Sequence, residues 1–260
     1  MKLSIIIVEY NSEDEVRKCV DTIVAGLGQG CEVIVSSNSC YGAERRRSIL
    51  SRYNDATWVF NDRNGGFAYA MNRGLEQASG DVLVAMNSDC CIGPDIMQMA
   101  DFLALHPDVG AVAPKMVDDE GHTQDTAREY VTLPRILWRQ AKRVFSRDAS
   151  ILERHMDYGR VQTVDWVIGA FIMLTRKAYE LTGGFDERFF MYAEDTDLCT
   201  RIRQKGLEVV YYPKVCITYK GTRRARHNLK YARIFLSSHL AYWHKFGFVW
   251  GYPRRKEIFY

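Results

Sequence analysis

The chain has 260 residues, with 35 Lys or Arg against 32 Asp or Glu, and a formal net charge of +3 at neutral pH. Hydrophobic residues make up 47% and charged residues 26%, a composition typical of globular proteins that excludes disordered, collagen-like and fibrous chains. A chain of this length can bury a core without disulfides or a structural metal.

The near-neutral total conceals an uneven distribution of charge. Residues 220–260 contain ten Lys or Arg and a single acid, Glu257, whereas the first 219 residues contain 25 basic and 31 acidic side chains. The tail therefore carries +9 and the body −6. A basic segment of this kind favours an anionic ligand or surface as its partner.

The sequence lacks the features of a membrane span and of a signal peptide. No apolar run approaches the ~18 residues that a membrane-spanning helix requires, and Leu3–Val8 is too short for the core of a signal peptide. The seven cysteines are scattered, with no C-x-x-C pair. This pattern favours reduced thiols, and we expect a cytoplasmic protein.

Strands and helices alternate through the first half of the chain. Leu3–Val8 is apolar and β-branched, as in a strand buried on both faces, and Ser12 with Glu15 is typical of a capping box at the start of a helix. Further strands are predicted over 32–36, 57–60, 81–86 and 109–113, and further helices over 44–52, 67–78 and 94–106. The alternation predicts an α/β fold with a mostly parallel central sheet and helices on both faces.

The second half is less regular. The predicted elements are a basic helix over 135–145, strands over 162–167, 170–174, 208–212 and 215–219, a helix over 195–205 and an aromatic-rich helix over 228–246. No internal repeat or low-complexity linker is present, so we expect one compact domain with a C-terminal helical extension. Ligands of such sheets bind at the carboxyl ends of strands, which makes the residues after the first, second and fourth strands the first candidates for a site.

Two common nucleotide-binding motifs are absent. Neither the G-x-G-x-x-G fingerprint nor the phosphate loop G-x-x-x-x-G-K-[ST] follows a predicted strand, and residues 9–12, Glu-Tyr-Asn-Ser, follow the first strand instead. The sequence therefore predicts that any nucleotide is bound without a glycine-rich phosphate cradle.

Two polar clusters are candidates for chemistry. Residues 87–89, Asn-Ser-Asp, follow the fourth strand and offer oxygen ligands that suit Mg²⁺ or Mn²⁺, although the same residue types are typical of an ordinary turn. Glu194, Asp195 and Asp197 follow an aromatic stretch, where a carboxylate can hold a raised pKa and act as a general base. The alternative is that these acids favour the N-terminus of a helix.

Together these segments resemble the family 2 glycosyltransferases of GT-A fold, and in particular the rhamnosyltransferase-like bacterial enzymes that build cell-surface polysaccharides. The resemblance implies a Rossmann-like nucleotide-diphospho-sugar transferase domain over 1–219, with 220–260 as a basic, aromatic helical extension packed on it. The motifs that carry the likeness are Val8–Ser12, Asn64–Gly74, Gly80-Asp81, Met86–Asp89, Val164–Phe171, Gly183–Glu187, Phe190–Cys199 and Arg201.

The resemblance further implies an inverting enzyme that moves a sugar, with rhamnose as a candidate, from a nucleotide-diphosphate sugar to a hydroxyl of a glycan or polyprenyl-linked acceptor. Asp195 would be the catalytic base, and Asp89 would bind Mg²⁺ or Mn²⁺. The residues that would contact the donor are Tyr10, Asn11, Ser37, Asn64, Gly65, Asn72, Asn87, Ser88 and Asp89. Those that would line the acceptor side are Trp166, Gly169 and Glu194.

The sequence departs from the family pattern at three places. Ser37 stands where the family usually has an Asp that contacts the nucleobase, and Tyr219 stands where it often has a metal-binding His. Glu9 replaces the small or polar residue usual before Tyr-Asn. A neutral Tyr is a poor Mg²⁺ ligand, so the metal would be weakly held, and Lys220 is the alternative partner of the diphosphate.

Several interpretations stay open. The aromatic and basic residues interleaved in 220–260 suit a peripheral contact at the inner face of the cytoplasmic membrane, but a helix packed on the domain or an oligomer contact explains them equally well. The basic stretch 135–145 could likewise lie on a membrane or be a solvated helix face.

No nucleic-acid recognition motif is present. Arg128 suits either a substrate loop or the surface, and His239 and His244 are expected to be surface or packing residues. The alternative function is a catalytically impaired domain that binds sugar or scaffolds a polysaccharide-assembly complex.

Overall fold

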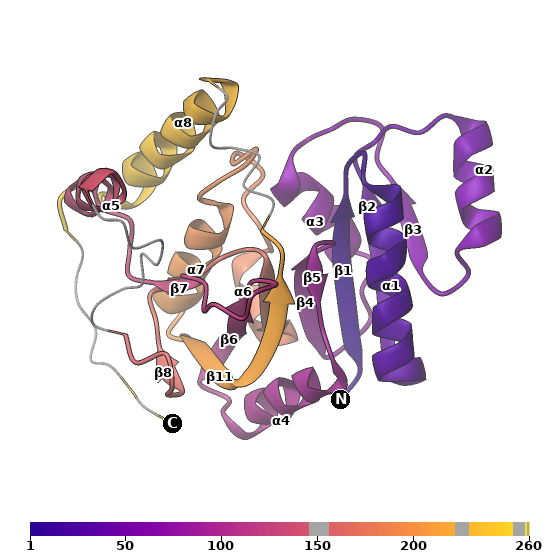
Figure 1. Ribbon diagram of the computed structural model, residues 1–260, viewed down its shortest axis with the longest axis horizontal. Coiled ribbons are helices and arrows are strands. Elements are labelled where there is room, and N and C mark those ends of the chain that lie inside the picture. The colour runs from indigo at the N-terminus through magenta and orange to yellow at the C-terminus, as the bar shows by residue number, and fades with distance from the viewer. Residues whose placement is uncertain (146–155, 222–228, 252–257, 259) are drawn as a thin grey trace.

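The computed structural model describes residues 1–145, 156–221, 229–251, 258 and 260, and Figure 1 shows how its elements are arranged. The strands are β1 (Leu3–Glu9), β2 (Cys31–Ser37), β3 (Thr57–Phe60), β4 (Val82–Asn87), β5 (Cys90–Cys91), β6 (Val109–Val117), β7 (Ala127–Arg128), β8 (Gln162–Thr163), β9 (Trp166–Val167), β10 (Phe171–Thr175) and β11 (Glu208–Tyr219). The helices are α1 (Glu13–Leu27), α2 (Ala43–Arg52), α3 (Phe67–Leu75), α4 (Met97–Leu105), α5 (Leu133–Phe145), α6 (Arg176–Thr182), α7 (Glu194–Gln204) and α8 (Leu229–Phe246), with 3₁₀ turns η1 (Gly28–Gly30) and η2 (Pro94–Ile96).

The central sheet is mostly parallel. Its strand order is β3-β2-β1-β4-β10-β6-β11-β5, with β8 paired to β11. β10 runs antiparallel to its neighbours β4 and β6, whereas β1, β2, β3, β4, β6 and β11 all run the same way. The carboxyl ends of these six strands therefore meet at one edge of the sheet, which is where ligands of such sheets bind.

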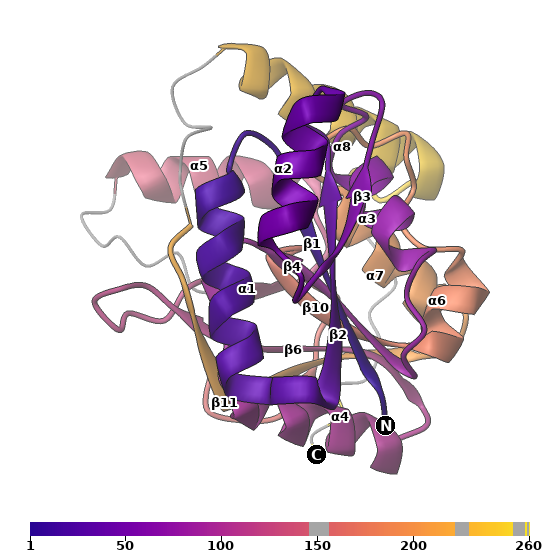
Figure 2. The ribbon, with the colours of Figure 1, turned by 90° about the vertical axis from the view of Figure 1, so that its right-hand side faces the viewer.

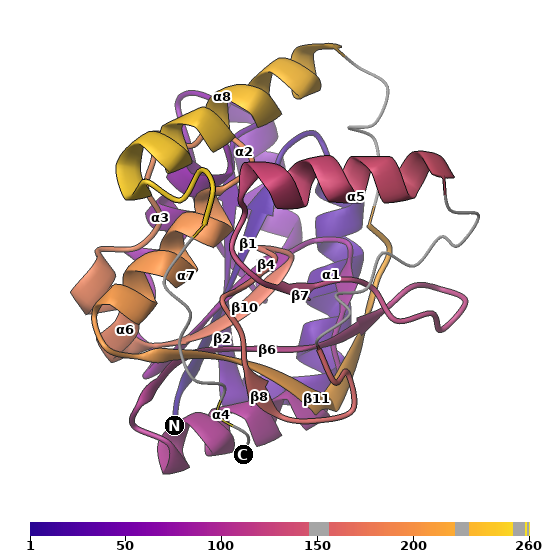
Figure 3. The same cartoon turned by 90° about the vertical axis from the view of Figure 1, so that its left-hand side faces the viewer.

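Helices cover both faces of the sheet because its central strands are apolar on both sides. Successive side chains of a strand point to opposite faces. Leu3, Ile5 and Ile7 of β1 pack with buried residues of α1, α2 and α4, and Ile6 packs with those of α3, α6 and α7. Figures 2 and 3 show α1 on one side of the strands and α6 and α7 on the other. The α/β class expected from the sequence is confirmed.

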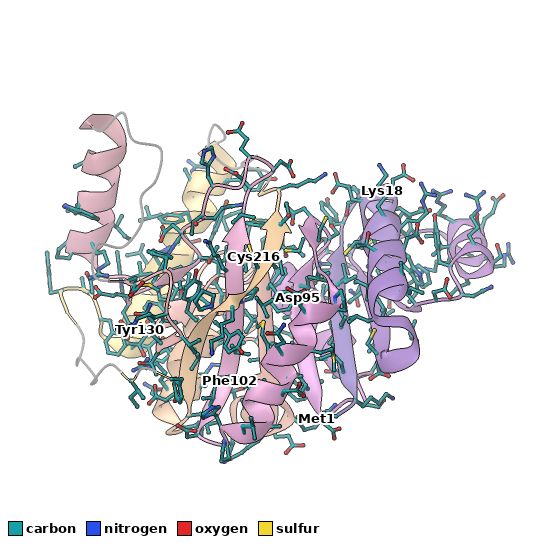
Figure 4. The ribbon with its side chains drawn as sticks, turned by 60° about the horizontal axis from the view of Figure 1, so that its bottom comes forward. Met1, Lys18, Asp95, Phe102, Tyr130 and Cys216 are labelled. Carbon is teal, nitrogen blue, oxygen red and sulfur yellow. The ribbon has the colours of Figure 1, made fainter. Side chains whose placement is uncertain are left out.

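Tyr260, the last of the described residues, packs against α4. The Phe102 ring of α4 lies 5.0 Å from the Tyr212 ring of β11 and 5.4 Å from the Tyr260 ring, centroid to centroid. Figure 4 shows Phe102 of α4 and Asp95 of the preceding turn η2 in front of the strands. The backbone N–H of Tyr260 also donates to the carbonyl of Val161, so this last residue is fixed to the domain.

The predicted elements are present, with differences in detail. The strand predicted over 162–167 forms two short strands, β8 and β9, which pair in different sheets, and β5 and β7 were not predicted. The capping box is wrong: Ser12 makes no side-chain cap, because its N–H donates to Glu9 Oε1 at 2.8 Å and holds it at φ −139° and ψ 32°. The two strands predicted over 208–219 form one strand, β11, with a register shift between Tyr212 and Cys216. Helix α6 was not predicted, since only Ala178 of its seven residues is buried and no apolar stripe marks it.

α8 packs beside α5 at the end of the molecule where the strands terminate (Figures 1 and 3). Tyr242 and Trp243 of α8 form a buried cluster with Phe189 and Ala193, against which Leu133 and Ile136 of α5 pack. Trp243 Nε1 donates to the Val131 carbonyl at 2.8 Å. Among the described residues, no helix combines the length and the apolar character that a membrane crossing requires.

Candidate active site

Asp195 lies in the first turn of α7, at the edge where the parallel strands end. Its Oδ2 accepts a hydrogen bond from the Gly169 N–H at 2.8 Å, and its Oδ1 accepts from the Thr196 N–H at 2.7 Å and the Thr196 hydroxyl at 3.3 Å. Burial raises the pKa of Asp195 above its ordinary value, and these donors and the charge of Arg128 oppose that rise. Donors that favour the charged form therefore hold the carboxylate in one orientation.

Glu194 precedes Asp195 and has a different environment. It is buried, and its Oε2 has no hydrogen-bond partner in the described part of the chain. Burial, and then the charge of Asp195, raise the pKa of Glu194 well above its ordinary value. Two neighbouring carboxyls titrate as a pair. Because Asp195 has the donors and Glu194 Oε2 has none, Glu194 takes up the first proton and Asp195 keeps the charge.

The turn before α7 has a strained backbone. Tyr192 and Ala193 have φ values of 68° and 65°, a left-handed conformation that costs roughly 1–3 kcal/mol for a non-glycine residue. α8 supports this turn: the Phe235 ring lies 5.6 Å from the Tyr192 ring, and Ser238 Oγ donates to the Met191 carbonyl at 2.8 Å. The C-terminal helix therefore helps to position the acids that follow the turn.

Asp197, the third acid of the cluster, is part of an ion network between α7 and α8. It is fully buried, and it pairs with Arg201 at 2.7 Å and with Lys245 of α8. Lys245 also pairs with Asp186 at 2.7 Å. The acidic cluster of the sequence thus contains a pair with raised pKa values, Glu194 and Asp195, and a member that is fully engaged in ion pairs.

Arg128 and Trp166 face each other on the short strands β7 and β9. The Arg128 Cζ lies 5.0 Å from the centroid of the Trp166 ring, and Arg128 Nε pairs with Asp125 at 3.1 Å. Trp166 is buried, and its Nε1 donates to the Glu129 carbonyl at 2.8 Å. Because the charge of Arg128 acts on the pKa of Asp195, the structure favours the site over the surface as the place of this arginine.

The start of α3 packs against the segment that leads to Asp195. The Phe67 N–H donates to the Phe190 carbonyl at 3.0 Å, and Gly66 has a φ of 90°. A Cβ on Gly66 would lie 2.2 Å from that carbonyl oxygen, so no side chain fits. Asn64 Oδ1 accepts from the Gly66 N–H at 3.1 Å and from Asn38 Nδ2 at 3.3 Å. These contacts connect the loops after β2 and β3 to the turn before α7.

Gly65 and Asn72, two predicted donor contacts, have packing contacts in the structure. A Cβ on Gly65 would meet the Tyr69 side chain at 2.5 Å. The Asn72 amide accepts from the Phe185 N–H at 2.8 Å and donates to the Phe185 carbonyl at 2.8 Å and to Glu187 Oε1 at 3.0 Å. Asn72 thus holds the loop that leads from α6 to α7, and its contact with a donor stays a prediction.

Asn87, Ser88 and Asp89 lie half-buried at the end of β4. The pairing of β5 with β11 places Tyr219 and Lys220 beside them, and the Lys220 N–H donates to the Asp89 carbonyl at 3.2 Å. Burial, and then the charge of Asp89, raise the pKa of Tyr219, and a hydrogen bond with the Asn87 side chain opposes the rise. Tyr219 is therefore a neutral phenol at physiological pH.

Few potential metal ligands among the described residues surround Asp89, and its contact with a metal stays a prediction. Across residues 1–145, 156–221 and 229–251, no group of three or more His, Cys, Asp or Glu side chains is arranged to hold an ion. Asp89 and Asn87 supply oxygen donors, and Mg²⁺ often takes only one or two carboxylates together with waters and substrate phosphates. These residues therefore fit a metal that is shared with a bound diphosphate.

The ends of β1 and β2 present the remaining predicted donor contacts. Tyr10 is 54% exposed, and Asn11 adopts a left-handed φ of 51° while its N–H donates to Ser39 Oγ at 2.7 Å. Ser37 is buried, and its hydroxyl donates to the carboxylate of Glu9. Two of the three departures from the family pattern, Glu9 and Ser37, are therefore hydrogen-bonded to each other.

Sequence reasoning missed an asparagine network behind these loops. Asn61 Nδ2 donates to Asn38 Oδ1 and to Ser36 Oγ, each at 3.0 Å, and Asn38 Nδ2 donates to the Gly66 carbonyl at 2.9 Å. Asn38 and Asn61 are both buried and each follows the last residue of a strand. Residues 87–89 were singled out because they follow a strand, and the same reasoning applies to these two asparagines.

A family model described as "Glycosyltransferase like family 2" matches residues 2–233. N-acetylglucosaminyl-diphospho-decaprenol L-rhamnosyltransferase of Mycobacterium tuberculosis is 25% identical over 272 residues, which cover 95% of this chain and 83% of that protein. O-antigen biosynthesis protein RfbC of Myxococcus xanthus is 30% identical over 215 residues, which cover 80% of this chain and 16% of that much longer protein.

Two solved structures share the fold. GalNAc-T7 with UDP, GalNAc and Mn²⁺ superposes with a TM-score of 0.67 at 13% identity, covering 94% of this chain and 48% of that chain. The mannosyltransferase PcManGT of Pyrobaculum calidifontis with GDP-Man and Mn²⁺ superposes with a TM-score of 0.61 at 20% identity, covering 94% of this chain and 64% of that chain. This chain thus spans about half of the first chain and less than two thirds of the second. The matched sequence and the shared architecture establish that the chain belongs to the family 2 glycosyltransferases and has the GT-A fold.

Proposed function

We propose that the protein is an inverting glycosyltransferase that moves a sugar, with rhamnose as the first candidate, from a nucleotide-diphosphate sugar to a hydroxyl of a glycan or polyprenyl-linked acceptor. The observation that carries the proposal is the unequal pair of buried acids at the strand edge. Asp195 has three hydrogen-bond donors and favours its charged form, while an oxygen of Glu194 has none among the described residues. A charged, oriented carboxylate beside a protonated one is an arrangement suited to general base catalysis.

The proposed reaction is a single displacement at the anomeric carbon. Asp195 accepts the proton of the acceptor hydroxyl, and the hydroxyl oxygen forms a bond to the anomeric carbon on the face opposite the diphosphate. The bond from that carbon to the diphosphate oxygen breaks, and the nucleoside diphosphate leaves with the electron pair. No protein nucleophile is required, and the configuration at the anomeric carbon inverts.

The order of strands supports a donor that lies along the edge. β2, β1, β4 and β10 are consecutive in the sheet, and neighbouring strands are ~4.8 Å apart. Asp89 follows β4, and Gly169, the hydrogen-bond partner of Asp195, precedes β10. A diphosphate at Asp89 with its sugar toward Asp195 leaves the nucleoside over β1 and β2, beside Tyr10 and Asn11.

Neutralisation of the leaving diphosphate involves Asp89. A Mg²⁺ or Mn²⁺ ion held by Asp89 and the diphosphate would supply the positive charge that stabilises the leaving group. Two structural neighbours contain Mn²⁺ together with a nucleotide, which supports the proposal. We expect EDTA to reduce activity strongly; full activity in EDTA would assign the neutralising role to Lys220 and nearby arginines instead.

The choice of acceptor rests on the relatives. One is named as a rhamnosyltransferase acting on a diphospho-decaprenol-linked sugar and another as an O-antigen biosynthesis protein. A panel of nucleotide sugars with detection of released nucleotide tests the activity, and NMR of the product tests inversion. Release from one donor with an inverted anomeric centre supports the proposal. Binding of nucleotide sugars without transfer to any acceptor offered would favour a sugar-binding or scaffold role.

A membrane-linked acceptor requires a surface that meets the membrane, and we assign this role to the outer sides of α5 and α8. Leu236 and Leu240 on α8 are 56% and 53% exposed, and Leu137 and Trp138 on α5 are 60% and 41% exposed. The segment 220–260 carries +9, and each basic residue near an anionic membrane contributes ~1 kcal/mol. The exposed apolar side chains of α5 and α8 and the net charge of the segment support a peripheral contact at the inner face of the cytoplasmic membrane.

Sedimentation with phosphatidylglycerol vesicles tests that contact. We expect binding at low salt that is lost at high salt and weakened by Leu236→Ser with Leu240→Ser. The matched control is Leu50→Ser with Leu105→Ser, two leucines that are 51% and 77% exposed on α2 and α4. If the unaltered protein ignores these vesicles at low salt, the outer side of α8 is assigned to contact between copies of the chain.

A further inference from the structure

The carboxylate of Glu9 is the centre of a hydrogen-bond cluster that nothing in the proposed chemistry uses. Glu9 ends β1 and is fully buried. Its Oε1 accepts from the Ser12 N–H at 2.8 Å and from the Tyr41 hydroxyl at 3.1 Å, and its Oε2 accepts from the Ser37 hydroxyl and from the Ser39 hydroxyl at 2.8 Å. One side chain therefore fixes two loops, 9–12 after β1 and 37–41 after β2.

All four donors to Glu9 are neutral groups. No ion pair to Glu9 is present in the described part of the chain, and its two oxygens are fully supplied by the hydroxyls and the backbone N–H. A carboxylate that already accepts four hydrogen bonds has no acceptor position left for a ligand. Its effect on a ligand must therefore pass through the loops that it holds.

The loops held by Glu9, at the carboxyl ends of β1 and β2, include Tyr10 and Asn11. Ser39 Oγ, which donates to Glu9, accepts the Asn11 N–H at 2.7 Å and so supports the left-handed φ of 51° at Asn11. The preceding residue, Tyr10, is 54% exposed. Without the carboxylate, both the conformation of Asn11 and the direction of the Tyr10 ring lose their support.

A carboxylate could reach the same hydroxyls from the neighbouring strand. Glu9 and Ser37 are register partners in the parallel pair β1–β2, and such strands lie ~4.8 Å apart. An acid at position 37 with a serine at position 9 would leave one carboxylate and the same number of hydroxyls in the cluster. The register thus allows the acid to be moved without being lost.

We propose that Glu9 is the positioning residue that determines which nucleobase the donor site accepts, and that it acts through Ser39 and Asn11. The inference rests on the proposed function, because it places the nucleoside of a nucleotide-diphosphate sugar over β1 and β2. The ligand class is a nucleoside diphosphate. The base lies against the loops 9–12 and 37–41, and Glu9 keeps these loops in the one arrangement that fits it.

Calorimetry with UDP, dTDP, GDP and CDP tests the proposal on the whole chain. The variants are Glu9→Ser, Glu9→Gln, Glu9→Ser with Ser37→Asp, and the control Glu13→Gln, an acid four residues away that pairs with Arg45 at 2.6 Å. We expect the unaltered protein to prefer one nucleotide. Glu9→Ser and Glu9→Gln should weaken the binding of that nucleotide by about tenfold or more, which corresponds to the loss of one to two hydrogen bonds. They should also bring the affinities for the four nucleotides closer together.

The double variant separates positioning from general support of the fold. Glu9→Ser with Ser37→Asp should restore at least part of the preference, and Glu13→Gln should leave it unchanged. Glu9→Gln keeps the shape of the side chain, so it provides the test if Glu9→Ser fails to fold. If the variants keep the same ratios among the four nucleotides as the unaltered protein, Glu9 supports the fold only. If the unaltered protein binds none of the four, the proposed function itself fails.

Discussion

Buried carboxylates at two places along one sheet edge have opposite surroundings. Glu9 at the β1–β2 end is saturated by three hydroxyls and a backbone N–H. At the α7 end, Asp195 has three donors, whereas Glu194 has an oxygen with no partner among the residues described. A saturated acid fixes its neighbours in place, and an uneven pair can accept and hold a proton. The number of hydrogen-bond donors around a carboxylate therefore distinguishes an acid that holds loops from an acid that handles a proton better than residue type or burial does.

The largest expected effect comes from breaking the link between these two regions. Gly66 accepts from Asn38 on the β2 side and packs on Phe190 on the α7 side. Because a Cβ would lie 2.2 Å from the Phe190 oxygen at a φ of 90°, we expect Gly66→Ala to lower the free energy of unfolding by about 3 kcal/mol or more. Urea denaturation measures this.

The matched control for that substitution is Gly30→Ala. A Cβ on Gly30 would have no other atom within 4 Å, and the backbone of Gly30 has no left-handed φ. Its replacement should therefore change stability by less than about 1 kcal/mol. Equal losses in the two variants would show that the contact between Gly66 and Phe190 does not hold the two regions together.

A smaller loss is expected from the ion network that supports the α7 end alone. Lys245→Met removes a partner from the buried Asp197, which keeps Arg201. We expect a loss of about 2 kcal/mol, below the roughly 3–5 kcal/mol of a buried charge left without any partner. Urea denaturation checks this, with Lys245→Arg expected to recover most of the loss and exposed His244→Ala to change little. A Lys245→Met protein as stable as the original would contradict the network's role.

The smallest expected effect is on the pH dependence of turnover. Asp195 must be charged to act as a base, so activity falls as pH drops through its raised pKa. The charge of Arg128 opposes that rise, so Arg128→Gln should move the acid limb of kcat to higher pH. Tyr41→Phe, which removes a donor from Glu9, should leave the limb in place. If the acid limb of kcat moves equally in both variants, the Glu9 cluster and the Glu194–Asp195 pair do not have separate roles.

Most of the fold was predictable from local patterns. The strands of the first half are short, apolar and β-branched, and its helices carry apolar stripes, so strand 57–60 was predicted to the residue. The antiparallel direction of β10 was not predictable, because the apolar run Phe171–Thr175 is compatible with either direction. The direction depends on where the preceding chain enters the sheet, and β9, which comes before β10, pairs with β7 outside the central sheet.

The candidate site was predictable only in part. The acids Glu194, Asp195 and Asp197 were singled out because they follow an aromatic stretch, and the family resemblance indicated Asp195 as the base. The structure gives Asp195 donors from Gly169 and Thr196. The Glu9 cluster could not be foreseen, since its hydroxyls come from Ser37, Ser39 and Tyr41, which are 28 to 32 residues away along the chain. Hydrogen bonds across strands leave no periodic pattern in a sequence.

The role of Asp195 as the base is tested most directly by Asp195→Asn, with turnover and donor affinity measured on the same preparation. The amide keeps the shape of the side chain but accepts no proton, and loss of a general base typically costs about 10²–10⁴ in rate. We predict a loss of transfer in that range with donor affinity unchanged within about threefold. Transfer at the rate of the unaltered protein would contradict the assignment of Asp195 as the base.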